Sequence, residues 1–321
     1  MRETSKTSNE NNENKDSSKG VKLLVFKIVL IILLYYSNYK YTNKKEKLKK
    51  QYPYYFTNIY KYEEEIDLIK GGSLQIFKNP NKNEEMETKT GKIYKSDIVF
   101  LIIPGGSYEK LGISERDVIA KKFFYLGYSS AILKYGVYPK CYPTNYNQGL
   151  LSIKILSSKF PKIIIMGFSA GGHLAGLLGT TERAKLYNSV GMILCYPVIS
   201  FVKNVHEKSR RNFFGDENEN NEKNRQLFSI ENRVNKDTLP TFIWTIQDDQ
   251  VVPYENTLFM IDKLKEFNIT YDSIVFEKGR HGMALADHFS IKYGIKEYEN
   301  KTVSKWVQSA CDFVGKVVKN S

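Results

Sequence analysis

The sequence predicts an α/β fold, in which a mostly parallel central sheet is covered by helices on both faces. Short, continuous runs of apolar residues, many of them β-branched, recur along most of the chain. Runs of this kind are typical of strands that are buried on both sides, as they are in a parallel sheet. Between them lie longer segments whose apolar residues recur at helical spacing. Strands that alternate with helices in this way favour a sheet between two helical layers.

The expected elements follow one another in a regular order from about residue 70. The expected strands are 74–77, 98–103, 130–133, 163–166, 190–196, 241–246 and 271–276. The expected helices are 119–126, 146–160, 173–178, 258–267 and 303–317. Two polar stretches, 79–95 and 212–224, interrupt this order and are expected to be exposed loops.

A G-x-S-x-G pattern at 167–171 stands between the apolar strand 163–166 and the apolar helix 173–178. A serine in so tight a strand-to-helix turn adopts a strained backbone, and the two glycines let the turn close against its neighbours. The hydroxyl of Ser169 then projects above the sheet. The N–H of Ala170 lies at a helix N-terminus, where it faces any negative charge that develops.

Two further residues follow at the ends of later strands and complete a possible catalytic triad. Asp249 follows the strand 241–246, and His281 follows the strand 271–276. Reactive groups of a parallel sheet gather at the carboxyl ends of its strands. The chain order Ser169, Asp249, His281 is the one found in hydrolases with a nucleophile elbow. We therefore predict that His281 activates Ser169 and that Asp249 orients His281.

Alternatives exist for two of these three positions. His288 is the main rival of His281, whereas His173 lies within the helix after the elbow and is expected to pack or cap there. His206 precedes the last strands. The neighbouring Asp248 is expected to be a turn residue whose side chain is solvated or bonded to the backbone.

The expected oxyanion hole combines the elbow with the loop after the strand 98–103. That strand runs into the sequence Pro-Gly-Gly-Ser-Tyr at 104–108. We predict that the backbone N–H of Ala170 and one or two amides of the loop Gly105, Gly106, Ser107 stabilise the negative charge of a tetrahedral intermediate. Each such donor is typically worth roughly 3 kcal/mol in the transition state.

At this point the chain resembles a family of α/β-hydrolase-fold serine esterases, similar to acetyl-xylan and feruloyl esterases and to dienelactone-hydrolase-like and hormone-sensitive-lipase-like proteins. The resemblance covers about residues 70–318 and rests on PGGSY (104–108), GFSAGGHLA (167–175), CYPVISF (195–201), the segment 229–258 and GRHGMAL (279–285). It implies the α/β-hydrolase fold and the same triad. It also implies an oxyanion hole formed by Gly105, Gly106 and Ala170. The family usually has a third glycine where this chain has Ser107.

The expected function is that of a serine carboxylic-ester hydrolase that forms an acyl-enzyme, acts on small-molecule esters of short acyl groups, and needs no cofactor and no metal. A membrane-surface lipase or lysophospholipase and a peptidase or formamidase stay open as alternatives. A non-catalytic binding module is a further one, although every member of the expected triad is present.

The N-terminal region differs in character from the rest of the chain. Residues 1–20 are polar and expected to be disordered, and 42–52 form a basic linker before the catalytic domain at 53–321. The segment 21–41 has lysines at one end and tyrosines at the other, which predicts a transmembrane signal-anchor or a signal sequence. A soluble helix is the third alternative. Six lysines at 40–50 stand against five basic residues in the first 22. The positive-inside rule, taken literally, therefore places the domain on the cytoplasmic side, but the difference is one residue and the side of the membrane stays open. A signal sequence would instead make it secretory or extracellular.

Composition excludes several other classes of protein. The net charge is +13, but residues 1–50 alone hold 12 Lys and Arg against 5 Asp and Glu. The remaining positive charge is spread sparsely along residues 51–321 and forms no basic stripe with interleaved aromatic residues. No nucleic-acid partner is therefore expected. The three cysteines, Cys141, Cys195 and Cys311, are widely spaced. They suit neither a disulfide framework nor a zinc site, and Cys195 is expected to fill the core.

Overall fold

The computed structural model describes residues 27, 30–31, 33–40, 42–47, 50, 63–82, 84–140, 142–216, 218–219, 221–287 and 298–321. Contacts divide the chain into two units, residues 1–57 and 58–321. In the first unit the described residues 33–40 and 42–47 are helical and exposed. The predicted tail, 1–20, and part of the segment 21–41 lie outside the described residues. Within the part of the chain that is described, no helix combines the length and apolar character needed to cross a membrane.

An eight-stranded sheet forms the centre of the second unit, in the order β1-β2-β6-β5-β7-β8-β9-β10. Its strands are β1 (Glu64–Leu68), β2 (Gly72–Phe77), β5 (Ile98–Ile103), β6 (Ser129–Lys134), β7 (Lys162–Phe168), β8 (Ser189–Cys195), β9 (Thr241–Ile246) and β10 (Tyr271–Phe276). The first two strands pair antiparallel, and the six from β6 to β10 pair parallel. The predicted fold class is confirmed, and each of the seven predicted strands is present.

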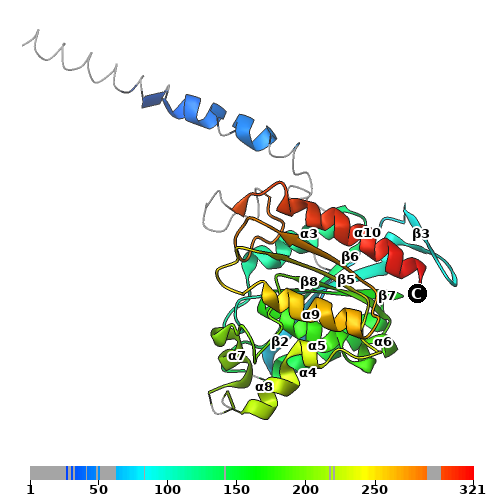
Figure 1. The fold of residues 1–321 in the computed structure, drawn as a ribbon. Helices are drawn as coiled ribbons and strands as arrows, with labels where there is room; N and C mark the ends of the chain where they lie inside the picture. The colour runs from blue at the N-terminus through cyan, green and yellow to red at the C-terminus, as the bar shows by residue number, and fades with distance from the viewer. Residues whose placement is uncertain are drawn as a thin grey trace, which may run out of the picture. The chain divides into compact units, whose positions relative to one another are not determined.

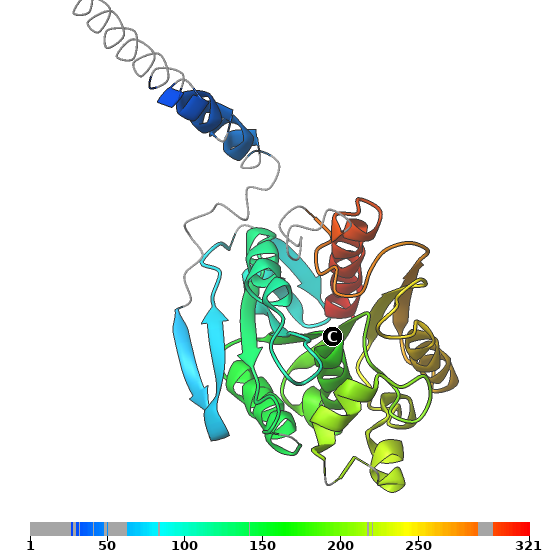
Figure 2. The same ribbon diagram turned by 90° about the vertical axis from the view of Figure 1, so that its left-hand side faces the viewer.

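Helices cover both faces of this sheet (Figures 1 and 2). One layer contains α3 (Asp117–Tyr125) and α10 (Trp306–Lys319). The other contains α4 (Thr144–Ser157), α5 (Ala170–Gly179), α6 (Glu182–Leu186) and α9 (Glu255–Glu266). Every residue of β5 is fully buried between the two layers. The continuous apolar run that predicts this strand therefore has its physical cause in burial on both sides.

The order of the strands determines where a ligand can bind. From β5 the chain passes through α3 to β6 on one side, and then returns through α4 to β7 on the other side of β5. The connections that leave β5 and β7 therefore run to opposite faces of the sheet. In open α/β sheets, the common ligand site lies at such a point, outside the carboxyl ends of the two strands.

Two predicted loops have a different structure. The stretch 79–95 contains the hairpin of β3 (Glu85–Thr88) and β4 (Gly91–Tyr94), which pair antiparallel. We did not predict these two strands from the sequence, because polar residues alternate along the stretch and the strand pair is exposed on one side. The stretch 212–224 begins inside α7 (Glu207–Phe214) and ends inside α8 (Glu222–Phe228), and Asn212 is only 8% exposed. The polar composition of this stretch therefore did not mean a wholly exposed loop.

Candidate active site

Ser169 lies in a sharp turn between β7 and α5. Its backbone φ is 52°, a strained value for a residue with a side chain, and α5 begins with the next residue. Glycine is needed two positions later because a Cβ on Gly171 would lie 2.2 Å from the carbonyl oxygen of Ile103. The close approach brings the elbow against the end of β5. The predicted turn is therefore present, with Ser169 5% exposed at its tip.

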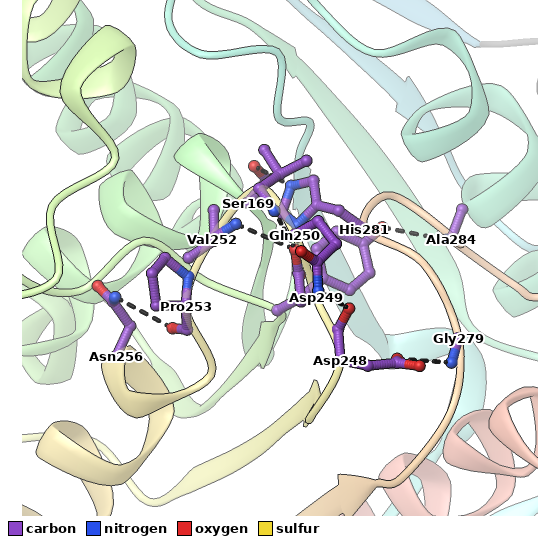
Figure 3. A network of polar contacts seen from close by, with 12 residues as sticks. Ser169, Asp248, Asp249, Gln250, Val252, Pro253, Asn256, Gly279, His281 and Ala284 are labelled. Atoms are coloured by element: carbon purple, nitrogen blue, oxygen red, sulfur yellow. Dashed lines mark hydrogen bonds and ion pairs between the residues drawn. The ribbon is translucent and has the colours of Figure 1, made fainter.

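His281 lies on the loop after β10, here called the His281 loop (277–287), and contacts both other members of the predicted triad (Figure 3). Its Nε2 is 2.8 Å from the Oγ of Ser169, and its Nδ1 is 2.6 Å from Oδ2 of Asp249. The three residues come from loops that follow three different strands. The structure therefore brings together the three side chains that the sequence predicts.

The contacts of Asp249 determine how the imidazole can be protonated. Its Oδ1 accepts hydrogen bonds from the N–H groups of Val251 and Val252, at 2.8 and 3.0 Å. Its side chain is fully buried, so the carboxylate is fixed in one orientation. A carboxylate can only accept, so Nδ1 of His281 carries a hydrogen and donates it to Oδ2. Nε2 is left as the acceptor that faces the hydroxyl of Ser169.

Asp248 and Asp249 have separate roles despite being adjacent. Oδ1 of Asp248 accepts from the backbone N–H of Gly279 at 3.0 Å, and Oδ2 lies 3.5 Å from Nζ of Lys278. This side chain therefore joins the turn after β9 to the start of the His281 loop. It is a turn residue bonded to backbone, as predicted.

The other histidines are held elsewhere. His173 is fully buried in α5, and its Nδ1 and Nε2 lie 2.8 Å from the hydroxyl of Tyr108 and the carbonyl oxygen of Phe228. Burial lowers the pKa of His173 to about 3, so it packs as a neutral group. Burial, and then nearby His281, lower the pKa of His206 to about 4. His288, the rival of His281, lies outside the described residues.

One member of the predicted oxyanion hole is already engaged. The N–H of Gly105 donates to Oε2 of Glu115 at 2.8 Å, inside the protein. Its hydrogen is therefore not available to an oxyanion, and the prediction for the Gly105 amide is wrong. Among the described residues, no hydrogen-bond partner accepts from the N–H groups of Gly106 and Ala170. These two amides stay as candidate donors.

Residues that the sequence analysis did not single out hold the 104–112 loop in place. The hydroxyl of Tyr135 donates to the carbonyl oxygen of Pro104 at 2.8 Å. Nδ2 of Asn212, on α7, donates to the carbonyl oxygen of Ser107 at 2.9 Å. No short motif marks these contacts, because each joins residues that are far apart in the chain. Six of the eight residues of α7 are polar or charged, so its sequence does not distinguish Asn212 from its neighbours.

The model of the prolyl oligopeptidase family matches residues 158–320, about half of the chain, and this range contains the whole triad. The chain belongs to the prolyl oligopeptidase family. The chain is also 31% identical over 220 residues to endo-1,4-beta-xylanase B of Butyrivibrio fibrisolvens. This match covers 62% of the chain and 34% of the xylanase. It is 32% identical over 128 residues to an acetylxylan esterase of Xylanibacter ruminicola, covering 39% and 26% of the two chains. It thus spans about a third or less of these relatives.

Solved structures share the fold of this chain. A sugar hydrolase from Lactococcus lactis is 27% identical, with a TM-score of 0.62 over 79% of this chain and 97% of the other. A carboxylesterase from Lactobacillus plantarum shares the fold, at 22% identity and a TM-score of 0.65 over 79% and 96%. The predicted resemblance is confirmed, and so is the prediction of a hydrolase with the α/β-hydrolase fold.

Proposed function

We propose that this family member is a serine carboxylic-ester hydrolase. The observation that carries the proposal is the position of His281, whose two ring nitrogens lie 2.8 Å from Ser169 Oγ and 2.6 Å from Asp249 Oδ2. A serine hydroxyl becomes a useful nucleophile only when a base can take its proton. The acceptor nitrogen of His281 is within reach of that proton, and Asp249 holds the ring in the tautomer that the transfer needs.

The reaction proceeds in two halves on this arrangement. Oγ of Ser169 forms a bond to the ester carbonyl carbon while its proton passes to Nε2 of His281. The tetrahedral intermediate then breaks its bond to the alkoxide, which takes that proton and leaves as the alcohol. Water next attacks the acyl-Ser169 ester, again giving a proton to His281. The carboxylic acid leaves when Oγ recovers the proton, so the enzyme is regenerated with no cofactor.

The charge of the tetrahedral oxygen requires donors that are already in place. We assign the N–H groups of Ala170 and Gly106 to this role. The first is supported by its position at the N-terminus of α5, where the helix dipole favours negative charge. The second is supported by its place in the 104–112 loop, which begins beside the elbow, where a Cβ on Gly171 would lie 2.4 Å from the carbonyl oxygen of Pro104. Donors that are fixed before the reaction need no reorganisation when the charge appears, which makes them effective.

Acetyl and other short-acyl esters are the substrates we propose. The acetylxylan esterase to which the chain is similar gives direct support for an acetyl group. The first test is hydrolysis of p-nitrophenyl acetate by the full chain, compared with Ser169→Ala and His281→Ala. Loss of a triad member typically lowers turnover about 10⁶-fold. A folded wild-type chain without activity, or variants that keep it, would contradict the proposal.

A second candidate is cleavage of peptide bonds, which the family match itself favours. The same triad can attack an amide, although an amine is a poorer leaving group than an alkoxide. Paired assays with p-nitrophenyl acetate and a proline p-nitroanilide separate the two activities. The ester proposal predicts a higher kcat/KM for the acetate, and the opposite order would favour the peptidase.

The membrane anchor over 21–41 stays a prediction, and with it the location of the protein and a lipase acting at a membrane surface. Sedimentation of the full chain with vesicles of mixed phosphatidylcholine and phosphatidylserine tests membrane binding. A series of p-nitrophenyl esters of increasing chain length tests the acyl group. Highest kcat/KM at long chains would favour the lipase over the short-acyl esterase.

A further inference from the structure

Glu115 is a buried acidic residue that the mechanism above does not use. It lies at the end of a short 3₁₀ turn, η3 (Ile113–Glu115), between β5 and α3, and it is only 5% exposed. A buried carboxylate is costly unless hydrogen-bond donors surround it. The donors that reach Glu115 come from two separate loops of the active site.

The first donor belongs to the 104–112 loop. Oε2 of Glu115 accepts from the backbone N–H of Gly105 at 2.8 Å. The loop makes room for the carboxylate by using glycine on both sides of it. A Cβ on Gly105 would lie 2.9 Å from this oxygen and one on Gly112 would lie 2.7 Å from it. The carboxylate therefore occupies space that side chains at both positions would fill.

The second donor leads to the His281 loop. Oε1 of Glu115 accepts from the hydroxyl of Tyr196 at 2.9 Å, and that same hydroxyl accepts from the N–H of Ala284 at 3.0 Å. Burial, and next the nearby charge of Glu115, hold the pKa of Tyr196 far above its usual range, so the phenol keeps its proton and donates it. The Tyr196 ring also contacts the imidazole of His281 edge-on, with centroids 5.0 Å apart.

We propose that Glu115 is a positioning residue that ties the 104–112 loop to the His281 loop through the hydroxyl of Tyr196. The inference rests on the proposed function, because it concerns groups that we assign to catalysis there. It goes beyond that function in naming a residue that touches neither Ser169, Asp249 nor His281 by hydrogen bond, yet sets the distance between the two sides of the site.

The geometry of the peptide unit explains how this contact can affect catalysis. In a trans peptide, the C=O of one residue and the N–H of the next point in opposite directions. The N–H of Gly105 is fixed by Glu115, and its C=O is fixed by the N–H of Gly112 at 2.9 Å. The direction of the Gly106 N–H, a proposed oxyanion donor, is fixed with them. Loss of the carboxylate would release the first of these two restraints.

The test compares Glu115→Gln with Glu231→Gln in the full chain. Glutamine has nearly the same volume, but its single side-chain oxygen can accept only one of the two hydrogens that now point at Glu115. Glu231, on η4 (Ile230–Asn232), is another buried glutamate, 7% exposed, and it serves as the matched control. Thermal unfolding establishes first that both variants are folded.

Hydrogen–deuterium exchange measures the positioning role directly. In Glu115→Gln we expect amides of peptides covering 104–112 to exchange at least about 10-fold faster than in the wild type. The Glu231→Gln chain should exchange like the wild type in these peptides. Equal protection of the 104–112 peptides in all three chains would overturn the proposal, whether or not the protein hydrolyses esters.

Kinetics measure the catalytic consequence. For p-nitrophenyl acetate we expect Glu115→Gln to lower kcat on the order of 10- to 100-fold, since small misplacements of catalytic groups have effects of this size. KM should change less than about two-fold, because the contact acts on the transition state. An active wild type with an unchanged Glu115→Gln kcat would overturn the proposal and leave the esterase intact. An inactive wild type would contradict the proposed esterase function only. The positioning role of Glu115 would then still be tested by hydrogen–deuterium exchange.

Tyr196→Phe gives a second variant if Glu115→Gln does not fold. It removes one hydroxyl and keeps the buried ring and the carboxylate. We expect faster exchange in peptides that contain Ala284, together with a loss of kcat of the same order as in Glu115→Gln. Unchanged exchange at Ala284 in a folded Tyr196→Phe chain would contradict the link between the two loops.

Discussion

The triad and the 104–112 loop lie at the same edge of the sheet, but they are held in different ways. Each triad residue lies in the loop or turn that follows a strand, and its key contacts are to the other two or to amides close by, as with Asp249 and Val251. The 104–112 loop depends instead on side chains that come from elsewhere. Glu115, Asn212 and Tyr135 bond its backbone from three separate parts of the chain.

This difference separates the groups that react from the groups that position. The triad residues carry chemistry that few residue types can supply, so short patterns in the sequence reveal them. The loop needs only donors and acceptors at the right places, and many residue types can provide these. Variants of the two regions should therefore differ in the size of their effect on catalysis, and the comparison can be tested in that order.

Among the variants that compare the two regions, the largest effect is expected for Asp249→Asn. The amide would no longer force the hydrogen onto Nδ1 of His281, so the imidazole could adopt the tautomer that cannot accept from Ser169. We expect kcat for p-nitrophenyl acetate to fall about 10⁴-fold, as loss of the correct tautomer does in the serine protease triad. The matched control is Asp248→Asn, whose carboxylate contacts Gly279 instead. Equal losses at both positions would contradict the assignment.

A smaller effect is expected where the elbow meets the loop. In Gly171→Ala the new Cβ would lie 2.2 Å from the carbonyl oxygen of Ile103 and 2.4 Å from that of Pro104. Neither backbone atom can move without shifting β5, so the free energy of unfolding in urea should fall by about 3 kcal/mol. Gly315→Ala, in α10, meets no atom within 4 Å and should raise it by up to about 1 kcal/mol. A Gly171→Ala chain as stable as the wild type would contradict this packing.

The third prediction concerns the effect of pH on His173, whose Nδ1 lies 2.8 Å from the hydroxyl of Tyr108 in the 104–112 loop. Its pKa is about 3 in the folded chain, against 6.5 as its ordinary value. Between these values the unfolded chain binds a proton that the folded chain does not, so this stability is complete above pH 6.5 and is lost as the pH falls. From pH 7 to pH 5 the loss should be about 2 kcal/mol. The free energy of unfolding in urea should therefore fall between pH 7 and pH 5 by about 2 kcal/mol less in His173→Gln than in the wild type. An equal fall in the two chains would contradict the prediction.

The smallest effect is expected for Asn212→Ala. This change removes the hydrogen bond from α7 to the carbonyl oxygen of Ser107 but leaves the bonds of Glu115 and Tyr135 to the loop in place. We expect kcat for p-nitrophenyl acetate to fall about 10-fold, with KM nearly unchanged. A loss as large as that of Asp249→Asn would show that the loop and the triad cannot be separated as we describe.

Most of the sheet could be predicted from the sequence because burial on both faces leaves a continuous apolar run, as in β5. The hairpin of β3 and β4 could not, since its strands have four residues each, combine polar with apolar side chains and contain no fully buried residue. The three triad side chains were predicted from strand ends and chain order. The use of the Gly105 amide was predicted wrongly, because its acceptor is a glutamate ten positions later that no local pattern connects to it.

The most direct test of Ser169 as the activated nucleophile is to treat the full chain with a fluorophosphonate probe and to locate the adduct by mass spectrometry. A nucleophilic serine activated by His281 attacks phosphorus as it would an ester carbonyl, which leaves a stable adduct. We expect a single adduct on Ser169 in the wild type and none in folded Ser169→Ala. A folded wild type that stays unlabelled, or an adduct that persists in Ser169→Ala, would contradict it.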